Sequence, residues 1–341
     1  MNSSEKKRVC IIYTGGTIGM VETSSGYAPK AGFLSETLHS MPELFRREIP
    51  EWEIIEFENL LDSSNISVAD WSKIARAIED NYDMYDGFVV LHGTDTMAYT
   101  ASALSFMLEG LGKPVVLTGS QIPIGKARSD ARENLITSLI IAGDRKCPEV
   151  TLFFGGKLMR GNRSTKMSAD EMIAFASPNF PDLANAAIDI RYKENLIRPA
   201  GKKLQVTHFS DDLPIAVLKI FPGIHFDLFE GIMTDKLKGL VLEGFGVGNI
   251  PQTDEGLIPI VRKAVQNGTV ITVCTQCLRG CVRLGAYETS SALKAAGAVS
   301  GYDMTVEAAV TKLYYLFAKG YDEYEIRHYM ESDLRGELTC E

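Results

Sequence analysis

The stretch that decides the fold is Val9-Cys10-Ile11-Ile12-Tyr13-Thr14-Gly15-Gly16-Thr17. Its uninterrupted apolar start is typical of a strand buried on both faces of a parallel sheet. The strand ends in a hydroxyl, two glycines and a second hydroxyl. In open α/β sheets the ligand binds at the C-terminal ends of the strands, and glycines let a ligand approach the backbone closely. The stretch therefore predicts a parallel α/β sheet with Thr14 at its ligand-binding edge.

The same arrangement recurs at Val89-Val90-Leu91-His92-Gly93-Thr94-Asp95-Thr96. Two strand ends that each carry glycine and threonine, one of them beside an acid, predict a threonine-based catalytic site. His92 either tunes this site or is a hydrogen-bonded histidine of the core, and the sequence leaves both interpretations open.

Predicted strands and helices alternate along the first half of the chain. The strands are expected at residues 9–13, 53–57, 87–91, 114–117 and 150–154, with helices near 35–47, from 67, at 96–111 and at 129–142. The polar residues 22–31 are expected to form a loop. Such short alternation predicts a parallel sheet covered by helices on both faces.

The polar residues 185–210 break this pattern, which then resumes. Further strands are expected at 215–220, 239–242 and 269–274, with helices at 256–266, 290–296, 305–318 and 322–330. We therefore predict two α/β domains. Residues 1–190 form the larger, catalytic N-terminal domain with a parallel-rich sheet, residues 191–212 a linker, and residues 213–341 a smaller C-terminal α/β domain.

The composition restricts the possible partners. The 341 residues are 45% hydrophobic and 23% charged, as in soluble globular proteins. A net charge of -9 argues against nucleic acid, which binds basic surfaces. No apolar run approaches the roughly 20 residues of a membrane helix, and the charged segment before Val9 lacks the apolar core of a secretory signal. We expect a cytoplasmic protein with no membrane partner.

The cysteines are too sparse for a disulfide scaffold and favour free thiols in a reducing compartment. They are Cys10, Cys147, Cys274, Cys277, Cys281 and Cys340. The cluster Cys274-x-x-Cys277-x-x-x-Cys281 lacks the second paired set that a strong zinc signature needs.

Two glycine-rich segments fail the tests for phosphate binding. Gly15-Gly16-x-x-Gly19 lacks the G-x-G-x-x-G spacing, and Gly119–Lys126 has five residues between its glycines where a P-loop has four. The chain also has no G-x-S-x-G elbow of a serine hydrolase.

A third polar run, Gly161-Asn162-Arg163-Ser164-Thr165-Lys166, follows the strand at 150–154. A surface loop is the simpler interpretation of this run alone. A threonine hydroxyl, however, needs a neighbouring base before it attacks. Lysine can be that base when burial lowers its pKa, and an aspartate can orient it.

Together these motifs resemble those of the L-asparaginases of the bacterial cytoplasmic (type I) kind, over essentially the whole chain. The matching segments are residues 13–19, 92–97, 160–166, 246–249 and 303–308. The resemblance implies hydrolysis of L-asparagine to L-aspartate and ammonia through a threonine nucleophile and an acyl-enzyme. It implies no metal and no organic cofactor.

The resemblance also implies roles for particular residues. Thr14 corresponds to the nucleophile and Tyr27, on the mobile loop after it, to an assisting group. Thr94, Asp95 and Lys166 correspond to a supporting triad. Tyr27, this triad and a water molecule all remain candidates for the group that deprotonates Thr14. The loop at 22–32 is expected to close over the site as a lid.

The implied substrate contacts suit a small zwitterion. Ser63, in the loop that starts at Asp62, would bind the α-carboxylate, and Asp95 would bind the α-ammonium group. A main-chain carbonyl near Ser120 would hold the amide nitrogen. Gly93 and Thr94 complete the set in the first domain, where backbone N–H groups before the following helix can stabilise an oxyanion.

Asn249, in the second domain, is expected to reach the site of a neighbouring subunit. The resemblance thus implies a homo-oligomer, a dimer or a dimer of dimers. Some members are also activated by asparagine near the segment Thr275-Gln276-Cys277, and Thr165, Glu243 and Cys277 are the candidate effector residues. Cooperative members tend to carry a basic residue at the position of Glu243. Because an acid repels the effector's carboxylate, we expect this regulation to be lost.

Three other functions compete with this interpretation. A glutaminase-asparaginase of broad specificity stays open, because one methylene changes binding by only roughly 1–3 kcal/mol. The related subunit of a tRNA amidotransferase is expected to carry an extra domain before the first catalytic strand, for which the eight residues before Val9 leave no room. A non-catalytic amide sensor is disfavoured because Thr14, Tyr27, Thr94, Asp95 and Lys166 are all present.

Overall fold

The computed structural model describes residues 6–339 except 25, 252–255 and 287. The chain divides into two compact units, Met1–His208 and Phe209–Glu341. In the part of the chain described here, no helix is long and apolar enough to cross a membrane. The predicted class of two α/β domains is confirmed, whereas the linker bounds stay a prediction.

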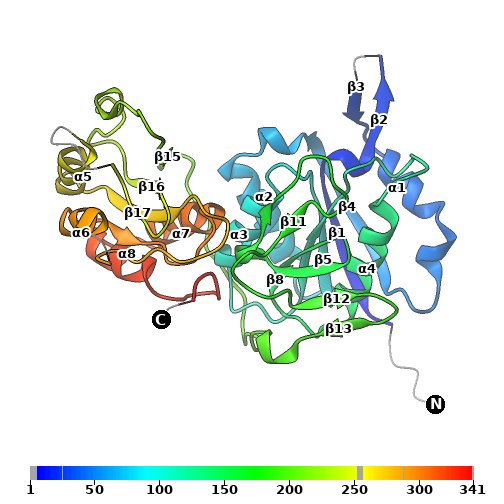
Figure 1. Cartoon of the computed structure of the whole chain (residues 1–341). Helices are drawn as coiled ribbons and strands as arrows, with labels where there is room; N and C mark the ends of the chain where they lie inside the picture. Colours follow the sequence, from blue (N-terminus) through cyan, green and yellow to red (C-terminus); the bar gives the residue numbers. More distant parts are fainter. Residues whose placement is uncertain (1–5, 25, 252–255, 287, 340–341) are drawn as a thin grey trace. The chain divides into compact units, whose positions relative to one another are not determined.

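The first unit is built on an eight-stranded sheet (Figure 1). Its parallel part, in sheet order, consists of β4 (Glu51–Leu61), β1 (Arg8–Gly15), β5 (Gly87–Leu91), β7 (Val115–Thr118) and β8 (Val150–Phe154). The antiparallel strands β9 (Lys157–Arg160), β12 (Ala184–Ala186) and β13 (Ile190–Tyr192) continue it to the other edge. The chain therefore leaves β1 toward β4 on one side and returns to β5 on the other.

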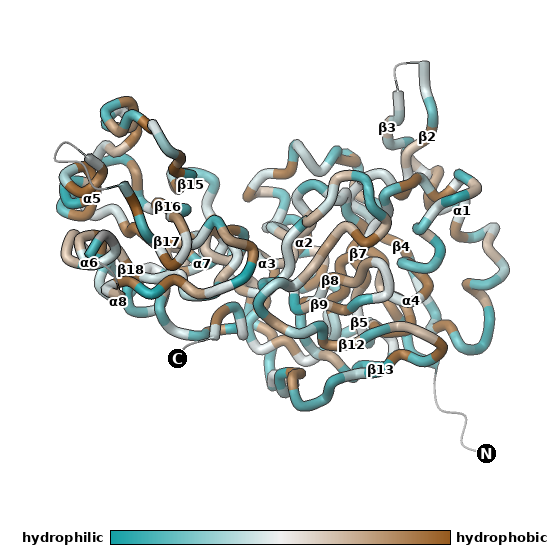
Figure 2. The backbone as a smooth tube through the Cα atoms, viewed as in Figure 1, coloured by the Kyte–Doolittle hydropathy of each residue, from teal (hydrophilic) through white to brown (hydrophobic). Residues whose placement is uncertain are grey.

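Helices cover both faces of this sheet (Figure 1). They are α1 (Phe33–His39) and α4 (Ala131–Asp144) on one face and α2 (Val68–Asn81) and α3 (Met97–Met107) on the other. Along β1, Val9, Ile11 and Tyr13 pack into the cluster that contains α1 and α4. Because side chains alternate along a strand, Thr14 faces the side of α2 and α3. In Figure 2 the central strands of the sheet carry many hydrophobic residues, coloured brown.

Local sequence explains two of these helices. Ser67 and Asp70 form a capping box at the start of α2, with Trp71 and Ile74 on its buried stripe. Helix α3 is buried on all sides, as its apolar and small residues require.

The second unit holds a four-stranded parallel sheet in the order β15 (Ile215–Lys219), β16 (Gly239–Gly244), β17 (Val270–Thr275) and β18 (Val299–Ser300). Its helices are α5 (Leu257–Gln266), α6 (Glu288–Ala295), α7 (Val306–Ala318) and α8 (Glu323–Met330). The thiols of Cys10, Cys147 and Cys274 are free and buried, whereas Cys340 lies outside the described residues.

Two regions differ from the sequence-based expectation. Residues 22–31, expected as a loop, belong largely to a hairpin of β2 (Met20–Thr23) and β3 (Gly26–Pro29) that projects from the first unit (Figure 1). The segment expected to be irregular from residue 185 begins with β12 and β13. Two further two-stranded sheets join β10 (Thr165–Lys166) to β11 (Phe175–Ala176) and β14 (Gln205–Val206) to β6 (Leu108–Glu109).

Candidate active site

The strand order places a ligand site between β1 and β5. The chain runs from β1 to β4 on one side of β1 and then to β5 on its other side, so β1 and β5 flank a switch point of the sheet. In open α/β sheets, ligands bind outside the C-terminal ends of the strands at such a point. Thr14 lies at the end of β1, and Thr94 lies just after β5. Both predicted threonine motifs therefore lie at this switch point, at the same edge of the sheet.

Glycines allow these two strand ends to touch. Gly16 has φ of 89°, and a Cβ there would lie 2.3 Å from the Gly93 nitrogen. A Cβ at Gly93 would in turn lie 2.5 Å from Ser63 Oγ. Neither position tolerates a side chain without moving its neighbours, so Gly16, Gly93 and Ser63 lie in close contact.

Thr14 is buried, and its hydroxyl is already hydrogen-bonded. Its Oγ1 donates to the carbonyl oxygen of Leu91 on the adjacent strand, at 3.0 Å. This bond must give way before the oxygen can transfer its proton to a base.

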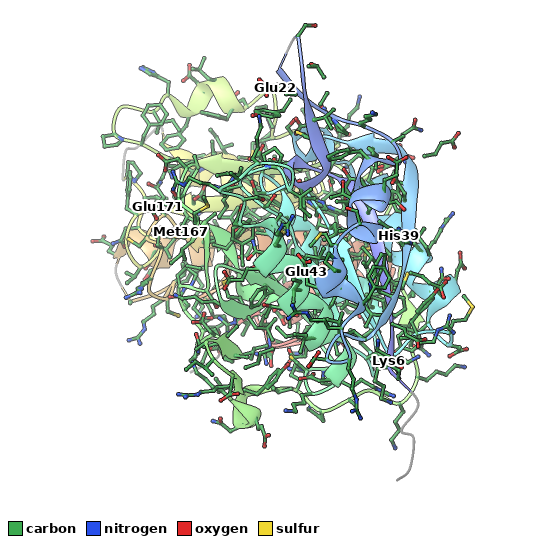
Figure 3. All side chains as sticks on the ribbon, turned by 90° about the vertical axis from the view of Figure 1, so that its right-hand side faces the viewer. Lys6, Glu22, His39, Glu43, Met167 and Glu171 are labelled. Atoms are coloured by element: carbon green, nitrogen blue, oxygen red, sulfur yellow. The ribbon has the colours of Figure 1, made fainter. Side chains whose placement is uncertain are left out.

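Thr94, Asp95 and Lys166 form a hydrogen-bonded group. Lys166, on β10, donates from Nζ to Thr94 Oγ1 at 2.9 Å and to Asp95 Oδ1 at 2.7 Å. Its side chain is only 20% exposed, whereas that of Asp95 is 60% exposed. Met167 and Glu171 mark the loop that follows Lys166 in Figure 3. The lysine is thus sheltered, and one carboxylate edge stays open to a ligand.

Ser63 and Asp62 lie in the loop after β4, which contacts Asp95. The buried Ser63 Oγ accepts a hydrogen bond from the Asp95 N–H at 3.2 Å. Thr96 Oγ1 donates to the Ser63 carbonyl oxygen at 2.7 Å. The Asp62 carboxylate accepts bonds from the N–H and hydroxyl of Ser64, both at 3.0 Å, so its side chain caps the short turn at Ser63–Asn65.

Ser120 and Gln121 follow β7 at the same sheet edge. The buried Ser120 hydroxyl donates to the Ile122 carbonyl oxygen at 2.7 Å. Gln121 Oε1 accepts a bond from Thr94 Oγ1 at 3.2 Å, and Asp130 holds the Gln121 N–H. Gln121 is a site residue that sequence reasoning missed, although it directly follows Ser120.

Tyr27 lies on β3 of the projecting hairpin, 50% exposed. The ammonium group of Lys126 lies 5.4 Å from its ring centroid and 2.7 Å from Glu22 Oε2, on the paired strand. Figure 3 shows Glu22 on this hairpin. Among the described residues, no hydrogen bond joins Tyr27 to Thr14, and the ring of Tyr27 lies against Lys126.

The remaining predicted residues are divided between the units. Thr165 is on β10 of the first unit, whereas Glu243 is on β16 and Cys277 is exposed just after β17. Asn249 closes a turn through paired backbone bonds with Phe245, both of 2.8 Å. Within the described residues, no group of three His, Cys, Asp or Glu side chains could hold a metal ion.

His92 is buried beneath the Gly93–Thr94 turn. Its Nδ1 lies 2.7 Å from the Gly93 carbonyl oxygen, and its Nε2 lies 2.9 Å from Thr100 Oγ1. Burial lowers the pKa of the ring to about 4. The imidazole is therefore neutral near pH 7.

Two models of a known protein family match this chain. The family model "Asparaginase, N-terminal" matches residues 8–198, and the model "Glutaminase/Asparaginase C-terminal domain" matches residues 214–330. L-asparaginase 1 of Escherichia coli is 48% identical over 98% of this chain and 99% of its own length.

Two further relatives extend the comparison. The crystal structure of L-asparaginase I from Vibrio cholerae superposes with a TM-score of 0.91 at 46% identity, covering 98% of this chain and 100% of that one. The "60 kDa lysophospholipase" of Mus musculus is 43% identical and matches 98% of this chain but 63% of its own length.

Proposed function

The chain belongs to the asparaginase family, and from that premise we propose how its residues carry out the reaction. The protein is an L-asparaginase, a hydrolase that converts L-asparagine to L-aspartate and ammonia. The assignment of roles rests on the hydrogen-bonded group of Thr94, Asp95 and Lys166, which follows β5 at the same sheet edge as Thr14.

Thr14 is the proposed nucleophile. Its Oγ1 bonds to the side-chain amide carbon and gives a tetrahedral intermediate with a negative oxygen. The carbon–nitrogen bond then breaks, ammonia leaves with the proton that the hydroxyl released, and an ester to Thr14 remains. Water hydrolyses this ester to aspartate and restores the hydroxyl.

Lys166, oriented by Asp95, supports proton transfer through Thr94. The structure has Lys166 Nζ donating to both Thr94 Oγ1 and Asp95 Oδ1, which fixes the position of its nitrogen. Tyr27 and a water remain the other candidates for deprotonating Thr14.

The substrate's two charges select its binding groups. The partly exposed Asp95 carboxylate binds the α-ammonium group, and the Ser63 hydroxyl donates to the α-carboxylate while it accepts from the Asp95 N–H. Backbone around Gly93 and Ser120 lines the amide end, and Asn249 contributes from a second subunit.

The test measures ammonia release from asparagine and glutamine by the wild type, Thr14→Ala and Thr14→Ser. We expect asparagine turnover to be lost in Thr14→Ala and partly kept in Thr14→Ser, which retains a hydroxyl. With hydroxylamine present, the wild type should form aspartyl hydroxamate from the acyl-enzyme. Turnover by Thr14→Ala near the wild-type rate would exclude Thr14 as the nucleophile, and comparable rates with glutamine would identify a glutaminase-asparaginase.

The protein is further proposed to act as a homo-oligomer in the cytoplasm. Free buried thiols suit a reducing compartment. Large apolar side chains are exposed in the second unit at Val217, Phe221, Leu228 and Ile232, as at subunit interfaces. Co-expression of Thr14→Ala with Asn249→Ala chains should restore activity if Asn249 serves a neighbouring site, and light scattering gives the subunit number.

A further inference from the structure

Three buried polar side chains form a relay beneath the Gly93–Thr94 turn. Trp71 Nε1 on α2 donates to Thr100 Oγ1 on α3 at 3.1 Å. Thr100 Oγ1 lies 2.9 Å from His92 Nε2, and His92 Nδ1 lies 2.7 Å from the Gly93 carbonyl oxygen. All three side chains are buried, and the reaction proposed above uses none of them.

The chemistry of the groups fixes every proton in this relay. A carbonyl oxygen only accepts, so His92 Nδ1 must carry the ring proton. An indole N–H only donates, so the Thr100 oxygen accepts from Trp71 and gives its own proton to Nε2. The relay thus runs in one direction, from Trp71 through Thr100 and His92 to the Gly93 carbonyl.

This last bond sets the direction of a backbone donor. The Gly93–Thr94 peptide is trans, like the others in the described residues, so its C=O and N–H point in opposite directions. Because the C=O points at the buried ring, the Thr94 N–H points away from it. Among the described residues, this N–H has no hydrogen-bond acceptor, whereas the neighbouring Asp95 N–H is taken by Ser63 Oγ.

We infer that His92 is a positioning residue which, held by Thr100 and Trp71, aims the Thr94 N–H at the oxyanion of the tetrahedral intermediate. The inference rests on the proposed role of Thr14. A donor aimed at an oxygen that becomes negative only after attack stabilises the transition state more than bound substrate. Loss of the relay should therefore lower kcat and leave KM nearly unchanged.

The experiment uses the full-length enzyme and the isosteric change Thr100→Val, which removes the hydroxyl without touching the substrate site. Thr100→Ser restores the hydroxyl. Thr269→Val is the matched control, because it removes a buried hydroxyl just before β17 that donates to the Leu237 carbonyl oxygen in the second unit. His92→Leu removes the ring donor, whereas His92→Asn keeps an amide N–H close to the Nδ1 position. Each variant is measured for kcat and KM with asparagine and for the Kd of the product L-aspartate.

We expect Thr100→Val and His92→Leu to lower kcat by roughly 10- to 100-fold, with KM and the aspartate Kd within about twofold of wild type. Thr100→Ser, His92→Asn and Thr269→Val should retain most of kcat. Unchanged kcat in Thr100→Val would overturn the inference. A joint rise of KM and Kd would also overturn it, because the whole loop with Asp95 would then be disordered. Full turnover by Thr14→Ala would instead defeat the proposed reaction.

Discussion

Lys166 divides its hydrogen bonds between Thr94 and Asp95, and these residues have different proposed tasks. Thr94 is proposed to pass on the proton of the nucleophile, and Asp95 to bind the ammonium group of the substrate. Lys166→Met keeps the apolar stem but removes the ammonium group, and we expect it to lower kcat by about 10²- to 10⁴-fold, the usual range for a general acid–base group. KM should change little. Steady-state ammonia release checks this.

Asp95→Asn is the informative companion of this variant, because it removes the anion that faces the substrate and should raise KM as well. Lys146→Met, on the surface, serves as the control for loss of a lysine charge. A Lys166→Met enzyme with more than half of the wild-type kcat would contradict a role for Lys166 in proton transfer.

At the residue scale, the sequence predicted that Thr94, Asp95 and Lys166 would act together, and the structure places them in one hydrogen-bonded group. Gln121 was missed because its contact with Thr94 depends on the adjacency of β5 and β7, which no local pattern encodes. The sequence alone does not decide whether His92 tunes the site or belongs to the core, because the hydrogen-bond partners of its ring, Gly93 and Thr100, are known only from the structure.

At the scale of elements, the hairpin of β2 and β3 has a specific anchor. Lys126 bonds to Glu22 and lies over the ring of Tyr27. These two contacts stabilise the observed position of the hairpin, in which Tyr27 lies against Lys126 and is half exposed. Both Glu22 and Tyr27 are substantially exposed, so salt should weaken this anchor.

Lys126→Ala should therefore shift the hairpin toward closure and lower KM for asparagine, by less than about tenfold, because a lid that must first be released weakens apparent binding. In high salt the wild-type KM should approach that of the variant. Arg132→Ala, which breaks the exposed pair with Glu43, is the matched control. A higher KM in Lys126→Ala would mean that the lysine stabilises the closed lid instead.

The predicted elements succeed or fail for physical reasons. The strands Gly87–Leu91 and Val150–Phe154 match their predicted bounds, because continuous apolar runs allow few alternatives. The hairpin was expected as a loop, since its strands are short, only partly buried and without an apolar alternation. Strand β12 is held by pairing with β9, a long-range contact that local composition does not reveal, and the edge strand β13 pairs in turn with β12.

At the scale of the whole molecule, one buried ion pair fixes the end of the described chain. Lys312 Nζ on α7 contacts Glu337 Oε1 at 2.6 Å, and both side chains are fully buried. Lys312 also donates to the carbonyl oxygens of Met330 and Ser332, and the Glu337 carboxylate accepts the N–H groups of Leu334 and Arg335. The pair therefore ties the segment after α8 to the core of the second unit.

Lys312→Met leaves the Glu337 carboxylate buried without its partner and should lower the free energy of unfolding by about 3–5 kcal/mol. Lys312→Met with Glu337→Gln should recover part of this loss, because no uncompensated charge remains. Thermal unfolding of the three proteins checks the order. Equal stability of the single and double variants would show that the charge pair is not the cause.

The same pair predicts a pH dependence. Burial alone would raise the pKa of Glu337, but Lys312 and the backbone N–H donors outweigh it and lower the pKa. A carboxylate with a lowered pKa in the folded state stabilises the protein above its unfolded pKa, and this stability is lost as the pH falls through the folded pKa. The difference between wild type and Lys312→Met should therefore be largest near neutral pH and shrink in acid.

Glu243, near the end of β16, bears on regulation by an effector. Gln276 holds this end of the strand, because its Nε2 donates to the Glu243 carbonyl oxygen at 2.8 Å. This bond keeps the strand end beside the turn that carries Cys277, so an amino acid effector bound there would place its carboxylate near an acid. Because like charges repel, we expect hyperbolic kinetics with asparagine, with a Hill coefficient of about 1. Glu243→Arg should introduce sigmoidicity if the rest of the effector site is intact. Clear sigmoidicity in the wild type, unchanged in Glu243→Arg, would show that this residue does not control regulation.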